Sequence, residues 1–144
     1  MNYIENEHLA QWISSGRALV APQEACAEFH DYLIEFPWLP TRLDWRNVDH
    51  EELDASGVSE AEFVSRAMRY RVGAHSNLLA LFSPEQPGII CSLEDGLSNL
   101  DYIYWKAPGI RYFCGLDIDP AGAPQYCYED FGEFDGFAGV TFRL

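Results

Sequence analysis

The sequence is short of basic residues, with one lysine and eight arginines against 23 acidic residues, and its formal net charge is −14 at neutral pH. A surface of this sign repels the phosphates of nucleic acids and the headgroups of anionic lipids. The charge therefore argues against direct nucleic-acid binding and against electrostatic docking onto a membrane. A basic protein is the partner that fits it.

Long apolar runs are also missing. The best ones, LLALF at 78–82 and GIIC at 88–91, fall far below the roughly 18 consecutive apolar residues of a membrane helix. The first 16 residues carry acids where a signal peptide carries basic residues. We therefore expect a soluble, cytoplasmic protein.

Cysteine is sparse, and no CxxC pair is present. An even number of cysteines keeps a disulfide possible, but a chain of 144 residues does not need such a crosslink to fold. We expect free thiols in a reducing compartment. The four cysteines are Cys26, Cys91, Cys114 and Cys127.

Sequence motifs for phosphate loops, zinc-protease helices and nucleophile elbows do not occur, so no catalytic residue and no cofactor is assigned. Asp117 and Asp119, with Gly122, match the opening of an EF-hand loop. The match fails at the fifth position, Ala121, and at the twelfth, Tyr128. We accordingly expect no bound metal and interpret this segment as a solvated turn.

An enzymatic alternative stays open at the same segment. Carboxylates at Asp117, Asp119, Glu129 and Asp130 are the kind of ligands that a metal-dependent hydrolase uses for a divalent ion. A regulatory adaptor domain is a further alternative.

Length and composition predict one globular domain over residues 1–144, since 48% of the residues are hydrophobic. Apolar residues at helical spacing predict three helices, over about 9–16, 22–36 and 59–71. The third starts with the capping-box pair Ser59 and Glu62.

From residue 77 onward, short apolar runs separated by proline and glycine predict strands. The segment SLED at 92–95 is alternatively the capped start of a short helix. The expected fold class is α+β, with N-terminal helices packed on one face of a mostly antiparallel C-terminal sheet. The predicted strands are 78–82 paired with 89–93, 102–105 paired with 110–116, and 138–144.

The stretch YCYEDFGEFDGF at 126–137 interleaves aromatic residues with carboxylates and contains no basic residue. Phe131, Phe134 and Phe137 recur at every third position, which predicts a compact loop with the rings inward and the acids outward. Such a platform would suit a protein interface. The residues that we assign to partner binding are Asp117, Asp119, Tyr126, Tyr128, Glu129, Asp130, Glu133 and Asp135.

With EDFGEFDGF as its most suggestive piece, the chain resembles the small acidic immunity proteins of bacterial polymorphic, contact-dependent and type VI secreted toxin systems. The resemblance implies a non-enzymatic protein that binds one basic toxin domain, a nuclease or a nucleotide-consuming fold, and covers its active site. It carries over no particular residues, and it leaves the oligomeric state open.

Overall fold

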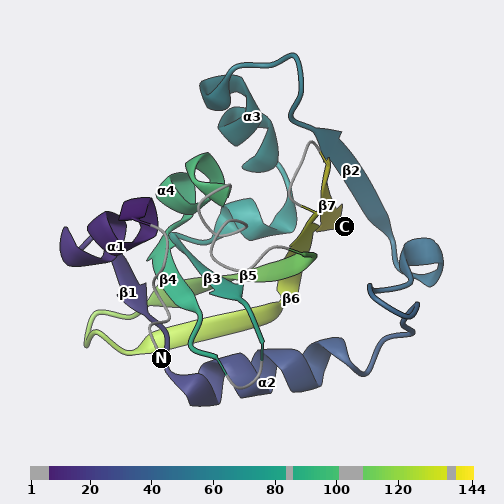
Figure 1. The fold of residues 1–144 in the computed structure, drawn as a ribbon. Helices are drawn as coiled ribbons and strands as arrows, with labels where there is room; N and C mark the ends of the chain where they lie inside the picture. The colour runs from purple at the N-terminus through teal and green to yellow at the C-terminus, as the bar shows by residue number, and fades with distance from the viewer. Residues whose placement is uncertain (1–6, 84–85, 101–108, 136–138) are drawn as a thin grey trace.

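In the described part of the chain, one antiparallel sheet of seven strands organises the fold (Figure 1). The computed structural model describes residues 7–83, 86–100, 109–135 and 139–144. Across the sheet the strands follow the order β1-β4-β3-β5-β6-β7-β2. They are β1 (Ala18–Val20), β2 (His50–Asp54), β3 (Asn77–Leu81), β4 (Ile89–Ser92), β5 (Arg111–Ile118), β6 (Pro124–Phe134) and β7 (Gly139–Arg143).

The helices of the described residues are short and are distributed along the chain. Only α2 exceeds three turns, and the two 3₁₀ segments connect helices to strands. The helices are α1 (Glu7–Ser14), α2 (Gln23–Leu33), α3 (Glu60–Ala67) and α4 (Leu93–Ser98), and the 3₁₀ segments are η1 (Trp45–Asn47) and η2 (Arg71–Ala74).

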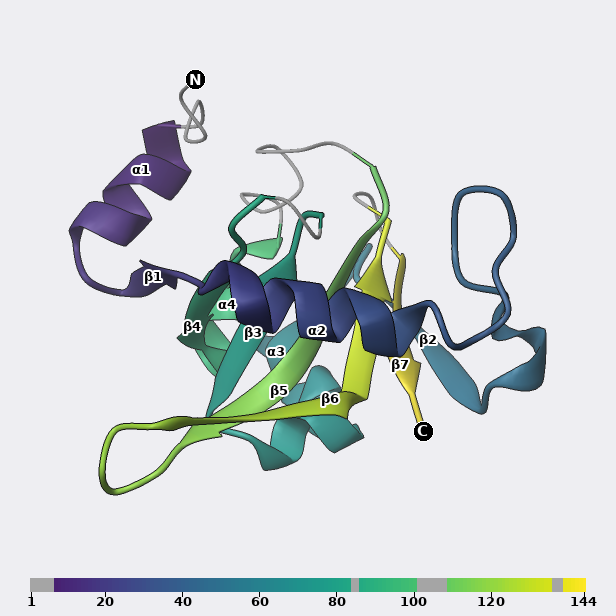
Figure 2. The ribbon, with the colours of Figure 1, turned by 90° about the horizontal axis from the view of Figure 1, so that it is seen from below.

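Helices cover both faces of the sheet. Leu78 and Ala80 of β3 pack in one core with α1, α3 and α4, whereas Leu79 and Leu81 pack in a second core with α2. Figure 2 shows α2 lying across one face of the sheet. The α+β class and the antiparallel sheet are thus confirmed, but the helices do not share one face as expected. The reason is that β3 is apolar at successive positions and needs cover on both sides.

Local signals located the helix starts well. Ser59 Oγ accepts a hydrogen bond from the backbone N–H of Glu62 at 3.1 Å, which is the first half of the predicted capping box. Ser92 Oγ accepts in the same way from Asp95, so the segment at 92–95 starts a helix, α4. The third helix ends at Ala67, earlier than predicted.

The predicted hairpin of 78–82 and 89–93 is confirmed as β3 and β4, which pair antiparallel. The last strand is confirmed as β7, where Val140 and Phe142 are buried in one core. Residues 102–105 of the second predicted hairpin lie outside the described residues. Its other half corresponds to β5, which pairs with β3 and β6.

The loop predicted within 126–137 is wrong for most of its length, because β6 continues to Phe134. Phe131 and Phe134 are both buried, but they belong to the two cores on opposite faces of the sheet. Side chains three positions apart on a strand point to opposite faces of the sheet. Because both faces of this sheet are covered, a strand can bury both phenylalanines without a compact loop. Phe137 lies outside the described residues.

None of the described helices is long and apolar enough to cross a membrane.

Candidate functional site

A break in strand register creates the most unusual polar site of the described chain. On β5 and β6, Cys114 pairs with Phe131 but the next residue, Gly115, pairs with Cys127. Residues 128–130 therefore have no counterpart on β5 and form a bulge. The bulge brings the side chains of Cys127 and Asp130 next to each other, with Cys127 Sγ 3.2 Å from Asp130 Oδ2.

His75 enters this site from a distant segment, just after η2 and before β3. Its ring occupies the space above Gly115, where an added Cβ would lie 2.6 Å from Cγ of His75. That distance is far below van der Waals contact, so this position accepts only a glycine while the ring stays in place.

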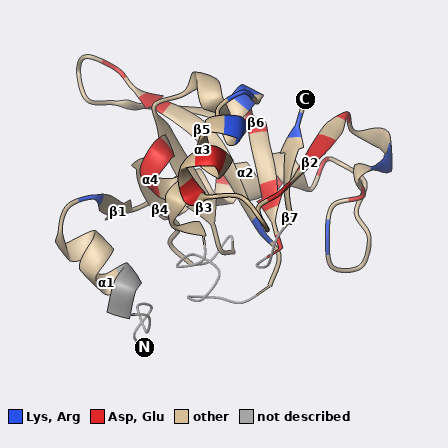
Figure 3. Ribbon diagram, turned by 90° about the horizontal axis from the view of Figure 1, so that it is seen from above, with Lys and Arg blue, Asp and Glu red and all other residues tan. Residues whose placement is uncertain are grey.

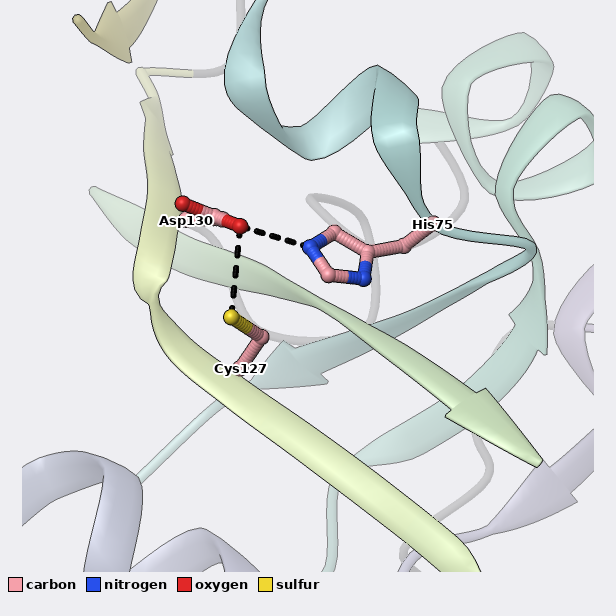
Figure 4. A group of neighbouring side chains, drawn as sticks. All are labelled: His75, Cys127 and Asp130. Atoms are coloured by element: carbon pink, nitrogen blue, oxygen red, sulfur yellow. Dashed lines mark hydrogen bonds and ion pairs between the residues drawn. The ribbon is translucent and has the colours of Figure 1, made fainter. Parts of the chain in front are cut away.

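Two carboxylates hold the imidazole from opposite sides. Its Nδ1 is 2.7 Å from Asp117 Oδ2, and its Nε2 is 2.6 Å from Asp130 Oδ2. Figure 4 shows Asp130 between the ring and the thiol of Cys127, with its oxygen directed at both. A carboxylate only accepts hydrogen bonds, so this arrangement, in which both ring nitrogens face carboxylates, favours the protonated ring.

The charge of the site follows from these contacts. Desolvation lowers the pKa of His75, but hydrogen bonds and charge attraction from Asp130 and Asp117 outweigh it, and the net effect raises the pKa. Desolvation raises the pKa of Asp130, but hydrogen bonds from His75, Cys127 and Arg71 lower it overall. The shifts therefore favour the charged forms of Asp117, His75 and Asp130, which we call the ion triad.

Arg71 and Ser76 each hold one aspartate of the triad in place. Arg71 donates from Nε to Asp130 Oδ1 at 2.6 Å, so this oxygen is neutralised separately from the Oδ2 atom that faces His75. Asp117 accepts from the backbone N–H of Ser76 at 2.9 Å, and the hydrogen bonds from His75 and Ser76 lower its pKa. Each aspartate is thus fixed by a second group.

The thiol of Cys127 is not activated in this arrangement. Burial, followed by the hydrogen bond and charge of Asp130 and those of Glu129, raises its pKa to about 12. Because both ring nitrogens of His75 face carboxylates, neither is free to take the thiol proton. A cysteine–histidine nucleophile is not what this geometry supports. None of the four cysteines forms a disulfide.

A second buried network surrounds Glu133, whose side chain is 1% exposed. It pairs with Arg42 and accepts from Trp45 Nε1 at 3.0 Å and from the Tyr112 hydroxyl at 2.7 Å. Tyr112 in turn accepts from the backbone N–H of Leu43. These bonds attach the segment between α2 and β2 to the sheet, because its polar groups and those of β6 satisfy each other.

These two networks correct the prediction that the acidic side chains of residues 126–137 all point outward. Asp130 and Glu133 are buried in internal ion pairs, so they do not point outward as predicted. Asp135 is partly buried, and Glu129 is exposed. Asp119 closes the turn after β5 by accepting from the backbone N–H groups of Ala121 and Ala123, as the solvated-turn interpretation implies.

Tyr126 and Tyr128 lie against α2 and are partly buried. Tyr128 stacks on Phe29 with ring centroids 5.6 Å apart and on Tyr126 at 5.7 Å. Its hydroxyl donates to Glu28 Oε2 at 2.9 Å. The two tyrosines therefore join the β5–β6 hairpin to α2, and whether they also contact a partner stays a prediction.

The outer side of α2 carries an acidic stripe, Glu24, Glu28 and Asp31, at positions i, i+4 and i+7, and all three are exposed. No lysine or arginine occurs within α2. Figure 3 shows that acidic segments also mark α3, α4 and β2. The acidic charge is therefore spread over several elements of the described chain.

Exposed apolar side chains adjoin one end of the stripe. Ile34 is 52% exposed, Trp38 39% and Leu39 41%. Trp38 is held in place because its Nε1 donates to the Leu33 carbonyl at 2.9 Å and its ring contacts Tyr112 edge-on. These three residues follow Leu33, the last residue of α2, and we call them the apolar end of α2.

Comparisons with protein-family models, with curated proteins and with solved structures find no match to this chain.

The sequence singled out Asp117 and Asp130 as candidate site residues and Cys127 as a free thiol. It did not predict that they lie next to His75. The one available signal was an isolated histidine followed by Ser76 and a buried strand, which is too common to select. Contact between residues 75 and 130 depends on strand order and on a bulge, and neither leaves a local pattern.

Proposed function

We propose that this chain is a cytoplasmic, non-enzymatic inhibitor that binds and neutralises a basic protein, namely a secreted toxin domain of nuclease or nucleotide-consuming type. The observation that carries the proposal is the acidic stripe of Glu24, Glu28 and Asp31 beside the apolar end of α2. Interfaces commonly combine buried apolar anchors with a charged rim.

The net charge of −14 supports the same function. An excess of acidic groups accelerates the encounter with a basic domain and also competes for the surface with which that domain binds nucleic acid or nucleotide. The β5–β6 hairpin extends the same face, since Tyr128 is bonded to Glu28, and it adds the exposed carboxylate of Glu129.

The hydrogen bonding of the His75 site does not favour catalysis by a free histidine or a free thiol. Both ring nitrogens contact carboxylates, and the pKa of the thiol is raised to about 12. This geometry provides neither a general base nor an activated nucleophile. The hydrolase alternative used Asp117, Asp119, Glu129 and Asp130, but Asp119 is engaged in its own turn.

The proposal is tested by capture from the host, with two matched baits. One bait carries Glu24→Gln, Glu28→Gln and Asp31→Asn, and the control carries Glu60→Gln, Glu62→Gln and Glu94→Gln on the opposite face. We expect the wild type and the control to retain a basic protein that the α2 variant loses.

The captured protein is then expressed alone and together with the wild type. We expect growth arrest that co-expression relieves, together with inhibition of its purified activity. A captured protein that is not toxic and is not inhibited contradicts the proposal, as does equal retention by the two variants.

A further inference from the structure

His75, Cys127 and Asp130 bring three kinds of metal ligand together. Their ligating atoms Nε2, Sγ and Oδ2 all lie within 4.8 Å of one another. Around a tetrahedral zinc ion with bonds of about 2.0–2.3 Å, such atoms are about 3.3–3.6 Å apart. To reach this spacing the Nε2–Oδ2 distance of 2.6 Å would open by about 0.7 Å and the Sγ–Oδ2 distance of 3.2 Å by about 0.3 Å.

We propose, in place of the expectation from sequence that no metal binds, that this bulge is a zinc site, with His75 Nε2, Cys127 Sγ and Asp130 Oδ2 as ligands. A thiolate, an imidazole and a carboxylate together favour Zn²⁺ over Mg²⁺, Ca²⁺ and Mn²⁺, which prefer oxygen ligands alone. The inference does not depend on the proposed inhibitory function.

The surroundings of the ligands are those of a metal site. Asp117 accepts from the far nitrogen of His75 and so fixes the tautomer that presents Nε2 to the ion, the arrangement found around most zinc-bound histidines. Arg71 holds the other oxygen of Asp130, so Oδ2 faces His75 and Cys127 and can turn towards the ion once their protons have left. Gly115 leaves room for the ring, because any side chain there would displace it.

Exchange of protons for zinc leaves the net charge of the site unchanged. Zinc replaces two protons, one from the Cys127 thiol and one from Nε2 of His75, and both are released to the buffer. The four groups Asp117, His75, Cys127 and Asp130 carry a summed charge of −1 with the protons and −1 with the ion. Arg71 and Glu129, the other charged groups at the site, keep their charges and contribute equally to both states.

The exchange of protons for the ion predicts that zinc affinity rises with pH. Calorimetric titration with ZnCl₂ in buffers of different ionisation enthalpy counts the protons directly. We expect two per zinc ion in the more acidic range.

The binding test uses the chelator-treated full chain, titrated with ZnCl₂ and separately with CoCl₂, which reports a thiolate ligand by a near-ultraviolet charge-transfer band. We expect one ion per chain and this band. Cys127→Ser removes the band and weakens zinc binding more than 100-fold. Asp117→Asn changes a residue that holds the ring but does not bind the ion, and it should weaken zinc binding about 10- to 100-fold.

Cys26→Ser is the matched control, because a serine oxygen can still accept the hydrogen bond that Gly88 donates to Cys26. It should bind zinc as the wild type does, and circular dichroism checks that every variant is folded. The proposal is overturned by a cobalt complex without the thiolate band, by equal zinc affinity of the wild type and Cys127→Ser, or by tighter binding of MnCl₂ than of ZnCl₂.

Discussion

The imidazole of His75 lies directly over Gly115, and the strand below it has no side chain at this position. We expect Gly115→Ala to displace the ring and to break its hydrogen bonds to Asp117 and Asp130. The free energy of unfolding should fall by about 2–3 kcal/mol, since overpacking and lost charged hydrogen bonds act together. Urea denaturation measures this change.

A double-mutant cycle separates the clash from any intrinsic effect of alanine on the strand. In a His75→Ala background the ring is gone, so Gly115→Ala should cost less than about 0.5 kcal/mol. If the cost is the same in both backgrounds, the close contact is not its cause.

The ion triad predicts a definite pH dependence of stability. The folded state raises the pKa of His75, so its contribution is complete below the unfolded pKa of about 6.5 and is lost as the pH rises through the folded value. The folded state lowers the pKa of Asp117 and Asp130, so their contribution is lost as the pH falls through their folded values.

The wild type should accordingly exceed His75→Gln by about 1.5–3 kcal/mol in free energy of unfolding near pH 5.5, and this difference should shrink towards pH 9. Urea denaturation of both proteins across this range, in the presence of a chelator, measures it. A difference that grows with pH would show that the ring is neutral in the folded protein.

Glu133 is the acid whose loss should harm the fold most among those of β6. Glu133→Gln removes the charge that Arg42 neutralises and weakens the bonds from Trp45 and Tyr112, so we expect a loss of about 2–4 kcal/mol. Thermal and urea denaturation provide the measurement. Glu129→Gln on the same strand is exposed and should change stability by less than about 0.5 kcal/mol.

The acidic stripe of α2 should act on the rate of association. Neutralising Glu24, Glu28 and Asp31 should lower the association rate constant of the captured partner about tenfold or more at low salt and flatten its salt dependence. Trp38→Ala should instead mainly raise the dissociation rate constant. Surface plasmon resonance separates the two, and thermal melts check folding. Unchanged rates in both variants would place the interface on another surface.

Local sequence signals were enough to predict individual helices, strands and one hairpin. The starts of α3 and α4 follow from Ser59 and Ser92, and the β3–β4 hairpin follows from two apolar runs joined by a turn. Strand β2 was not predicted, because the segment from His50 to Asp54 is acidic and only Leu53 in it is buried. An edge strand buries little, so it leaves little apolar signal.

The candidate site could not be predicted from the spacing of residues along the sequence, because it depends on contacts between distant segments. Glu133 looks in sequence like Glu129, yet one is 1% exposed and the other lies on the surface. The difference arises from Arg42 and Trp45, roughly 90 residues earlier, which fold back over β6. The same holds for His75, which reaches Asp130 only because β5 and β6 lose register.

The position of β2 at the edge of the sheet affects how readily this protein aggregates at high concentration. A free edge exposes unpaired backbone groups to which another chain can add a strand and so begin an aggregate. Here one edge is the three-residue β1, and the other, β2, exposes Glu51, Glu52 and Asp54. Two copies meeting at β2 would bring these carboxylates together, so their repulsion opposes edge-to-edge association of this chain.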